Sequence, residues 1–376
     1  MEENTQKTET MNVNENKKKL MEAVKDFFGK DLVQYIAKRL LMFIPTLVLI
    51  SVLVFIVIQL PPGDFVSSYI SKLSAEGEII TAQDAQELRE EYGLDKPVWY
   101  QYFKWVGDII WTPEDSEYYR LYGSHHNWKQ SFEYKKPVWD VVEERLGLTI
   151  LVSAIIMIFQ YGVSLPIAVY AATHQYSKGD YISSFFGFIG TAVPNFILGI
   201  LLMYVSFKWT GNANVGLFTQ DMLENGININ NFGDFLVRLI IPIIVIGTSG
   251  TCGIIRSVRA QMLDEIGRQY TLTARAKGVS EWTITMKYCF RAAINPTVSG
   301  LGGVLSSLFS GSTVTAMVLN MQIQGPVLFR ALQAQDMYLA GAIVMTQAVL
   351  VVIGILFSDI ALAFLDPRIR YSGGNR

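Results

Sequence analysis

Six long stretches of the chain carry no Asp, Glu, Lys or Arg, and this placement of charge constrains the fold more than any other feature. A helix that crosses a hydrocarbon core of about 30 Å needs roughly 20 mostly apolar residues. Most of the stretches meet that length, so helices buried in a large soluble protein are the weaker alternative. We predict an all-α integral membrane protein with six transmembrane helices, built on the runs Leu40–Gly63, Gly147–Thr173, Tyr181–Phe207, Leu239–Ile255, Ala292–Phe329 and Met337–Ser358.

Lys and Arg in the short connections set the expected orientation. Cytosolic loops carry an excess of both residues, whereas long segments cross the membrane largely regardless of charge. A dense basic group lies between the fourth and fifth runs, and further basic residues precede the first run and follow the last. We therefore expect both termini in the cytosol and residues 64–145 outside. The group comprises Arg256, Arg259, Arg268, Arg275, Lys277, Lys287 and Arg291.

This topology divides the chain into consecutive segments of different character. The N-terminal tail is polar enough that we expect it to be partly disordered. The external segment contains an insertion, at about 111–136, whose structure the pattern does not predict. The segments are a cytosolic tail (1–34), a first span with its lead-in (35–63), the external segment (64–145), a five-helix core (146–371) with a cytosolic loop at about 256–296, and a short tail (372–376).

The sequence offers little material for catalysis, for metal binding or for nucleic-acid recognition. Cys252 and Cys289 cannot build a disulfide framework or a metal site, and we expect His125 and His126 to be solvated loop residues. The net charge is −2, and the sequence lacks the basic stripe with interleaved aromatic residues that would indicate nucleic-acid binding. The run Gly247–Gly253 lacks the Gly-Lys-Ser/Thr ending that cradles phosphates. We predict no catalytic residue and no cofactor in this chain.

The stretch Thr273–Glu281, TARAKGVSE, is the most specific motif. Residues 270–277 can form a short helix, and Gly278 suits a C′ position, which needs a left-handed backbone. Ser280 can then cap a second helix, with Glu281 favourably placed in its first turn. An ordinary positive-inside loop would explain the charge of this segment but not the alanines, the glycine and the cap.

Side chains of this expected helix suggest that it contacts a partner. Small residues at Ala274 and Ala276 would let a partner surface approach closely, and Arg275 and Lys277 could pair with acidic groups on it. A capped helix can transmit a push that a structureless loop cannot. We expect Gly278→Pro and Ala274→Trp to leave folding intact and to uncouple the helix from its partner.

Here the sequence resembles a known family. TARAKG is similar to the EAA loop of bacterial ABC-importer permeases, in the form found in the oligopeptide/dipeptide branch. The stretch from Tyr35 to Phe65, which ends in PPGDF, resembles that branch's first span, and DIALAFLDPRIRY resembles its C-terminal signature. The likeness covers roughly 35–110 and 137–371. Leu272-Thr273-Ala274 stands where the general motif has Glu-Ala-Ala, and Asn295 precedes Pro296 in place of the usual Leu.

The resemblance implies a type I ABC-importer permease fold in the cell membrane of a prokaryote. It implies a complex with a homologous second permease, two ATPase subunits that bind ATP and Mg, and an external solute-binding protein. Oligopeptide is the expected substrate; an oligosaccharide is the main alternative, because PPGDF looks similar to members found beside oligosaccharide-binding proteins, and nickel complexes or opines also stay open. The implied coupling residues are Tyr270, Thr273, Ala274, Arg275, Ala276, Lys277, Gly278, Ser280 and Glu281.

A second pattern lies in the fifth run. Ser299, Gly303, Ser307 and Gly311 recur every four residues and so share one helix face. Such a stripe of small residues lets another helix approach closely. It could serve tight packing within the subunit, or it could lie at the seam with the second permease and leave room for solute.

Two other classes of protein compete with this interpretation. A secondary transporter usually shows repeated halves and broken helices, and we see no such halves. An intramembrane enzyme needs polar catalytic groups at membrane depth, whereas His174 lies at the end of a span and no second histidine lies within one.

Overall fold

The computed structural model describes residues 30–59, 95–112, 126–131, 133–212, 215–226, 228–310 and 313–365, with the isolated positions 70, 74, 83, 86, 89–90, 116 and 120–121. Several predictions lie outside the described residues: the tail up to residue 29, the PPGDF stretch, His125, Gly311 and the end of the C-terminal signature. In the described part, helices dominate, and one two-stranded antiparallel sheet joins Gln130 to Pro137 and Ser131 to Lys136.

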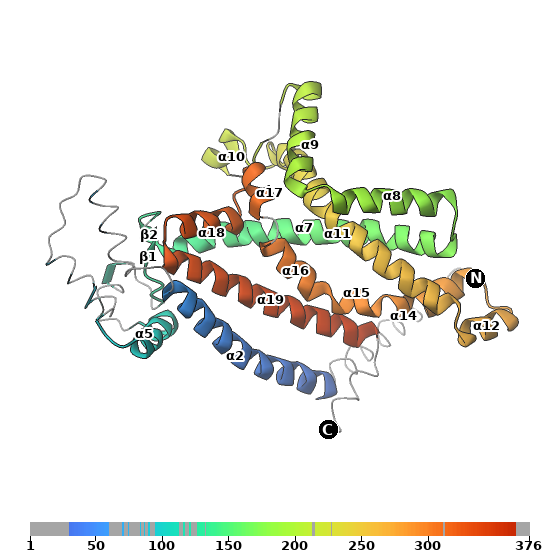
Figure 1. The fold of residues 1–376 in the computed structure, drawn as a ribbon, viewed down its shortest axis with the longest axis horizontal. Coiled ribbons are helices and arrows are strands. Elements are labelled where there is room, and N and C mark those ends of the chain that lie inside the picture. The colour runs from blue at the N-terminus through green and yellow to red at the C-terminus, as the bar shows by residue number, and fades with distance from the viewer. Residues whose placement is uncertain are drawn as a thin grey trace, which may run out of the picture.

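The elements follow one another in a simple order (Figure 1). They are α2 (Lys30–Gln59), α5 (Val98–Ile110), β1 (Gln130–Ser131), β2 (Lys136–Pro137), α7 (Val138–Thr173), α8 (Lys178–Ala192), α9 (Asn195–Thr210), α10 (Gln220–Asn225), α11 (Phe232–Ile266), α12 (Gln269–Ala276), α13 (Glu281–Thr283), the π-helix η1 (Ile284–Phe290), α14 (Arg291–Ala293), α15 (Asn295–Ser299), α16 (Leu301–Ser310), α17 (Thr313–Val318), α18 (Gln324–Gln333) and α19 (Met337–Leu365).

Among the described residues, four helices are long and apolar enough to cross a membrane. These are α2, α7, α11 and α19, and they correspond to the first, second, fourth and sixth predicted runs. The helix α11 extends well beyond the charge-free run at both ends and includes Arg238 and Arg256. A multi-pass membrane protein is confirmed, whereas the count of six spans stays a prediction.

The third predicted run is not one straight helix. It is divided into α8 and α9, which meet at an angle of 104°. Pro194 lies at this break, and proline disfavours helical backbone in the residue before it. The pair counts as a fifth span only if the bent helices are taken together.

The fifth predicted run is also divided, into α14, α15, α16, α17 and α18. At Gly300, between α15 and α16, the backbone keeps right-handed helical angles, and Val304 N–H donates a hydrogen bond to the carbonyl of Gly300 at 3.1 Å. This run therefore crosses much of the bundle in short helices.

The centre of the bundle is the packing of α7 against α11, which lie side by side in Figure 1. A Cβ on Gly250 would lie 2.3 Å from Gln160 Nε2, so glycine at this position leaves the room that the amide of Gln160 occupies between the two helices. Ser164 Oγ also donates to the carbonyl of Thr251 at 3.2 Å. The glycine-rich run that cannot bind phosphate thus serves helix packing.

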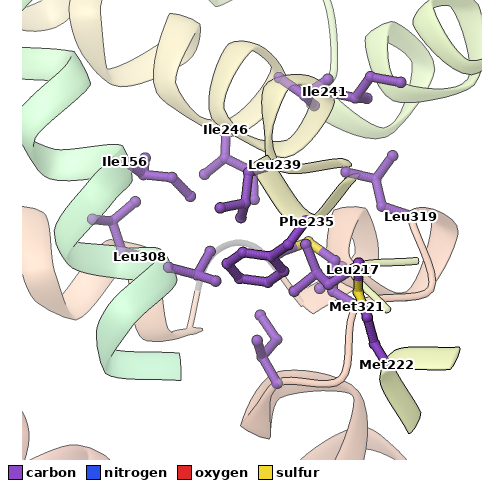
Figure 2. Close-up of a cluster of buried hydrophobic side chains, with 14 residues drawn as sticks. Ile156, Leu217, Met222, Phe235, Leu239, Ile241, Ile246, Leu308, Leu319 and Met321 are labelled. Atoms are coloured by element: carbon purple, nitrogen blue, oxygen red, sulfur yellow. The ribbon is translucent and has the colours of Figure 1, made fainter. Parts of the chain in front are cut away.

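A buried hydrophobic cluster joins α7, α11, α16 and α17 (Figure 2). Phe235 points into its middle, toward Leu217 and Met321, and Ile156 and Leu308 approach from the other side. Between membrane-spanning helices, close van der Waals packing of this kind stabilises the contact, because lipid tails are as apolar as the side chains themselves. The cluster fixes α17 and the chain after it against α11.

The ends of the bundle differ. The short helix α12 lies at one end, and α5 with β1 and β2 lies at the other (Figure 1). Asp336, fully buried just before α19, holds the latter end together because its carboxylate accepts hydrogen bonds from Ser131 Oγ at 2.6 Å and from Leu339 N at 3.1 Å. The helix α12, predicted to be cytosolic, and α5 with the sheet, predicted to be external, thus lie at opposite ends of the bundle.

Candidate functional site

The turn that follows α12 has the backbone that the motif predicts. Gly278 has φ +76°, in the left-handed region, and its N–H donates to the carbonyl of Arg275 at 2.9 Å. Val279 N–H donates to the carbonyl of Ala274 at 3.1 Å. These two bonds form the Schellman motif, in which a left-handed residue satisfies the last carbonyls of a helix. The prediction for Gly278 is confirmed.

Ser280 begins the next helical stretch, also as predicted. Its Oγ accepts a hydrogen bond from Thr283 N–H at 3.4 Å, which satisfies one of the free donors of the helix start. Glu281 occupies the first turn. The helix does not continue as a regular α-helix, since Ile284–Phe290 forms a π-helix, a rare feature often found at functional sites.

An ion pair closes the turn from outside. Arg275 Nε and Glu281 Oε1 lie 2.7 Å apart, and both side chains are solvent-accessible. The hydrogen bond from Arg275 lowers the pKa of Glu281 below its ordinary value. Arg275 therefore pairs within its own chain, whereas Lys277 is exposed and makes no ion pair within the described residues.

The helix α12 has one buried face. Thr271 and Ala274 are both buried, and Ala274 belongs to a cluster that includes Ile284 and Cys289. Ala274 is only 8% exposed, so its small side chain packs within this cluster, and its expected part in admitting a partner stays a prediction. Ala276 does lie on the exposed face, as expected.

Contacts with α11 hold α12 in place. Tyr270 donates a hydrogen bond from its hydroxyl to Glu265 Oε2 at 2.5 Å, and burial together with this bond raises the pKa of Tyr270. Thr271 Oγ1 lies 2.8 Å from the carbonyl of Ile266. The turn is thus fixed on one side to α11 and on the other to the helices that lead into α15.

Two exposed apolar residues flank the turn, and the sequence motif did not single them out. Leu272 is 49% exposed and Trp282 is 73% exposed. Their signal in the sequence is the presence of large apolar side chains within a basic, otherwise polar loop. With Thr273, Ala276 and Lys277 they form an exposed surface around the turn, which we call the α12 surface.

The stripe of small residues faces outward from the chain. Ser299, Gly303 and Ser307 are all exposed, and a Cβ on Gly303 would meet nothing within 4 Å. The close contact within the chain lies one residue away, since a Cβ on Gly302 would lie 3.1 Å from the Cα of Ile355 on α19. Packing of α16 against α19 therefore uses Gly302 and leaves Gly303 free.

Within the described residues, no group of three or more His, Cys, Asp or Glu side chains could hold a metal ion. Cys252 and Cys289 are buried and unpaired by disulfide. The expected absence of a metal site and of catalytic residues stays a prediction.

Comparison with known proteins identifies the family. The family described as the binding-protein-dependent transport system inner membrane component matches residues 164–371, which is more than half of the chain and includes α12 and the stripe. The chain belongs to this family. A second match, to the N-terminal part of such membrane components, covers residues 32–153 of the permease.

Curated relatives of the permease are similar over almost their whole length. The oligopeptide transport system permease protein AppB of Bacillus subtilis (strain 168) is 32% identical over 337 residues, covering 90% of this chain and 99% of the relative. The dipeptide transport system permease protein DppB of Escherichia coli (strain K12) is 29% identical, with the same coverage. DppB of Lactococcus lactis subsp. cremoris (strain MG1363) is 28% identical, covering 90% of this chain and 100% of the relative.

Proposed function

We propose that this permease is the membrane subunit of an ATP-driven importer that takes up oligopeptides delivered by an external solute-binding protein. It spans the membrane six times, with both termini in the cytosol and residues 64–145 outside. It works with a homologous second permease and with two ATPase subunits, which bind ATP and Mg and carry out hydrolysis. The family match, together with α12 at the end of the bundle opposite α5 and the sheet, supports this topology.

The proposed coupling to the ATPase subunits rests on how α12 is connected to the helices that follow it. A hydrogen-bonded left-handed turn and the Ser280 cap link it to η1, α14 and α15. The buried cluster around Ala274 and Ile284 connects the same elements through their side chains. Because cores of this density transmit displacement rather than absorb it, a push on the α12 surface moves the helices that carry Ser299 and Gly303.

Transport then requires the seam between the two permeases to open alternately to the outside and to the cytosol. Binding of ATP closes the ATPase pair and moves α12 of both permeases together, and the seam opens outward to receive the peptide. Hydrolysis and separation of the ATPase subunits return it to the inward state. In this scheme the exposed stripe lies between the two permeases, where its small side chains leave room for solute.

Peptide is the substrate class that the relatives favour. AppB is named for oligopeptide transport and DppB for dipeptide transport. None of the relatives reported above is named for oligosaccharide transport, so that alternative has no support beyond the likeness of PPGDF. Nickel complexes and opines have none either.

Uptake by the reconstituted complex tests the proposal. Proteoliposomes containing this chain, the second permease and the ATPase subunits receive a labelled peptide bound to the solute-binding protein. Uptake is expected only with ATP on the ATPase side and with the binding protein present. Uptake that continues without ATP under an ion gradient would contradict the proposal and favour a secondary transporter. A thermal-shift screen of the binding protein with peptides and glycans separates the two substrate classes.

A further inference from the structure

A polar cavity of about 300 Å³ lies at the end of the bundle that carries the sheet. It is bounded by the first turns of α7, by α17, by the chain between α17 and α18, and by α18 itself. Its apolar floor belongs to the cluster of Figure 2, since Ala316, Met321 and Ile323 are members of both. The cavity is therefore built on a fixed part of the core.

The charge of this cavity is one-sided. Arg145 on α7 and Arg330 on α18 both line it, and none of its lining residues is acidic. Neither guanidinium makes an ion pair or a side-chain hydrogen bond within the described part of the chain. Two arginines that share a cavity without a counter-charge favour an anion, and the planar guanidinium fork fits a carboxylate through two parallel hydrogen bonds.

A further polar group in the cavity requires a hydrogen-bond donor. Gln322 lines it, and its Oε1 is buried with no hydrogen-bond partner among the described residues. A buried acceptor without a partner is costly, roughly 1–3 kcal/mol, unless a water or a ligand donates a hydrogen bond to it, and the N–H of a ligand can take this place. Tyr134 and Asn320 add further polar atoms to the same wall. A ligand that carries both a carboxylate and a neighbouring amide N–H satisfies all of these groups.

We propose that this cavity is a subsite for the C-terminal residue of the transported peptide. Arg145 and Arg330 bind its carboxylate, and Gln322 accepts a hydrogen bond from its amide N–H. The site rests on the proposed function, and it adds a requirement for a free C-terminus that the permease itself imposes. The chain places the subsite directly after the stripe, because Ala316 and Met317 of α17 line the cavity.

An acidic side chain of the solute-binding protein is the competing source of a carboxylate. The unpartnered acceptor of Gln322 favours the peptide, since the C-terminal carboxylate and its amide N–H share one Cα, whereas an Asp or Glu side chain holds its carboxylate one or two carbons further from its backbone N–H. The two sources also predict different results when the C-terminus of the peptide is changed.

The test compares a free-acid peptide with its C-terminal amide in the full reconstituted importer. The pair is chosen so that the binding protein retains both forms with equal affinity, and rates are normalised to assembled complex. The wild type should take up the free acid about tenfold faster, which is the effect of about 1.4 kcal/mol from charge-assisted hydrogen bonding. In Arg145→Gln/Arg330→Gln the ratio of the two rates should fall to near one.

A matched control and the contrary results complete the design. Lys136→Gln removes a cation near the same end of the bundle but outside the cavity, and it should keep the wild-type ratio. The subsite is contradicted if the wild type carries both forms equally, or if the ratio survives in the double variant. The double variant could instead lose uptake of both peptide forms equally and need more loaded binding protein for half-maximal uptake. That result assigns the arginines to docking of the binding protein and also contradicts the subsite. No ATP-dependent uptake of either peptide by the wild type would instead contradict the proposed function.

Discussion

Arg275 and Glu281 bridge the turn around Gly278 through two contacts, Nε to Oε1 at 2.7 Å and Nη2 to Oε2 at 3.1 Å. The pair joins the last turn of α12 to the first turn of α13. It therefore stabilises the angle between these two helices from the solvent side, while the cluster around Ala274 stabilises it from within.

The strength of this pair should depend on pH. Arg275 lowers the pKa of Glu281 in the folded chain below the ordinary value of 4.5. The stabilisation is thus complete above the unfolded-state pKa and is lost as the pH falls through the folded-state pKa. At neutral pH, Glu281→Gln should increase hydrogen exchange at the amide of Val279, corrected for intrinsic rates. In acid the variant and the wild type should exchange alike, and Lys277→Gln should match the wild type throughout. Equal exchange at neutral pH would show that the pair does not hold the turn.

The left-handed backbone of Gly278, and not crowding of an added Cβ, should decide which substitutions this position tolerates. A Cβ there would meet nothing within 4 Å, but φ is +76°. We expect Gly278→Ala to cost about 1–2 kcal/mol of local stability, and Gly278→Asn to cost less, because Asn enters the left-handed region more readily. Hydrogen exchange of Val279 measures both. Gly278→Pro also removes the N–H that bonds to Arg275, so it should disrupt the turn. Equal effects of Ala and Asn would contradict this order.

Two alanines of α12 should respond in opposite ways to a large side chain. Ala274→Trp overfills the cluster with Ile284 and Cys289, and overpacking costs roughly 1–3 kcal/mol or more. We expect little assembled chain from this variant, contrary to the expectation from sequence. Ala276→Trp should insert and fold normally and should weaken attachment of the ATPase subunits. The yield of monodisperse permease and co-purification of the ATPase measure the two effects. A well-folded Ala274→Trp would contradict the buried position of this helix face.

Substitutions at two neighbouring glycines of α16 should have different effects, one on the stability of the chain and the other on its assembly with the second permease. Gly302→Ala forces a Cβ to 3.1 Å from the Cα of Ile355, so it should lower the thermal stability of the isolated chain. Gly303→Ala adds a methyl group in open space and should leave that stability unchanged. It should reduce co-purification of the second permease if the stripe lies at the seam. The seam prediction fails if Gly303→Ala assembles as well as the wild type.

Much of the turn could be predicted from the sequence because its determinants are local. Gly278 and Ser280 each act on a backbone conformation within a few residues, so their roles follow from residue type and order. The spans represented by α2, α7, α11 and α19 could likewise be predicted, since a long charge-free run needs no knowledge of its neighbours.

Other features could not be predicted because they depend on packing between distant elements. The helix α12 has eight residues, too few to show by periodicity that Ala274 rather than Ala276 is buried. The same limit applies to Gly302 and Gly303, whose difference is set by Ile355 on α19. The cavity brings together Arg145 of α7 and Arg330 of α18, which lie far apart in the sequence.

Crosslinking of α12 to an ATPase subunit tests the central claim most directly. Thr273→Cys places a thiol on the exposed face of α12, and Asn230→Cys places one on an exposed predicted external loop, while Cys252 and Cys289 are buried. In the assembled importer a short bifunctional maleimide should join Thr273→Cys to an ATPase subunit and stop ATP-driven uptake, and Asn230→Cys should give no such product. Labelling of Thr273→Cys from the outer medium by a membrane-impermeant maleimide, with no ATPase crosslink, would contradict the account.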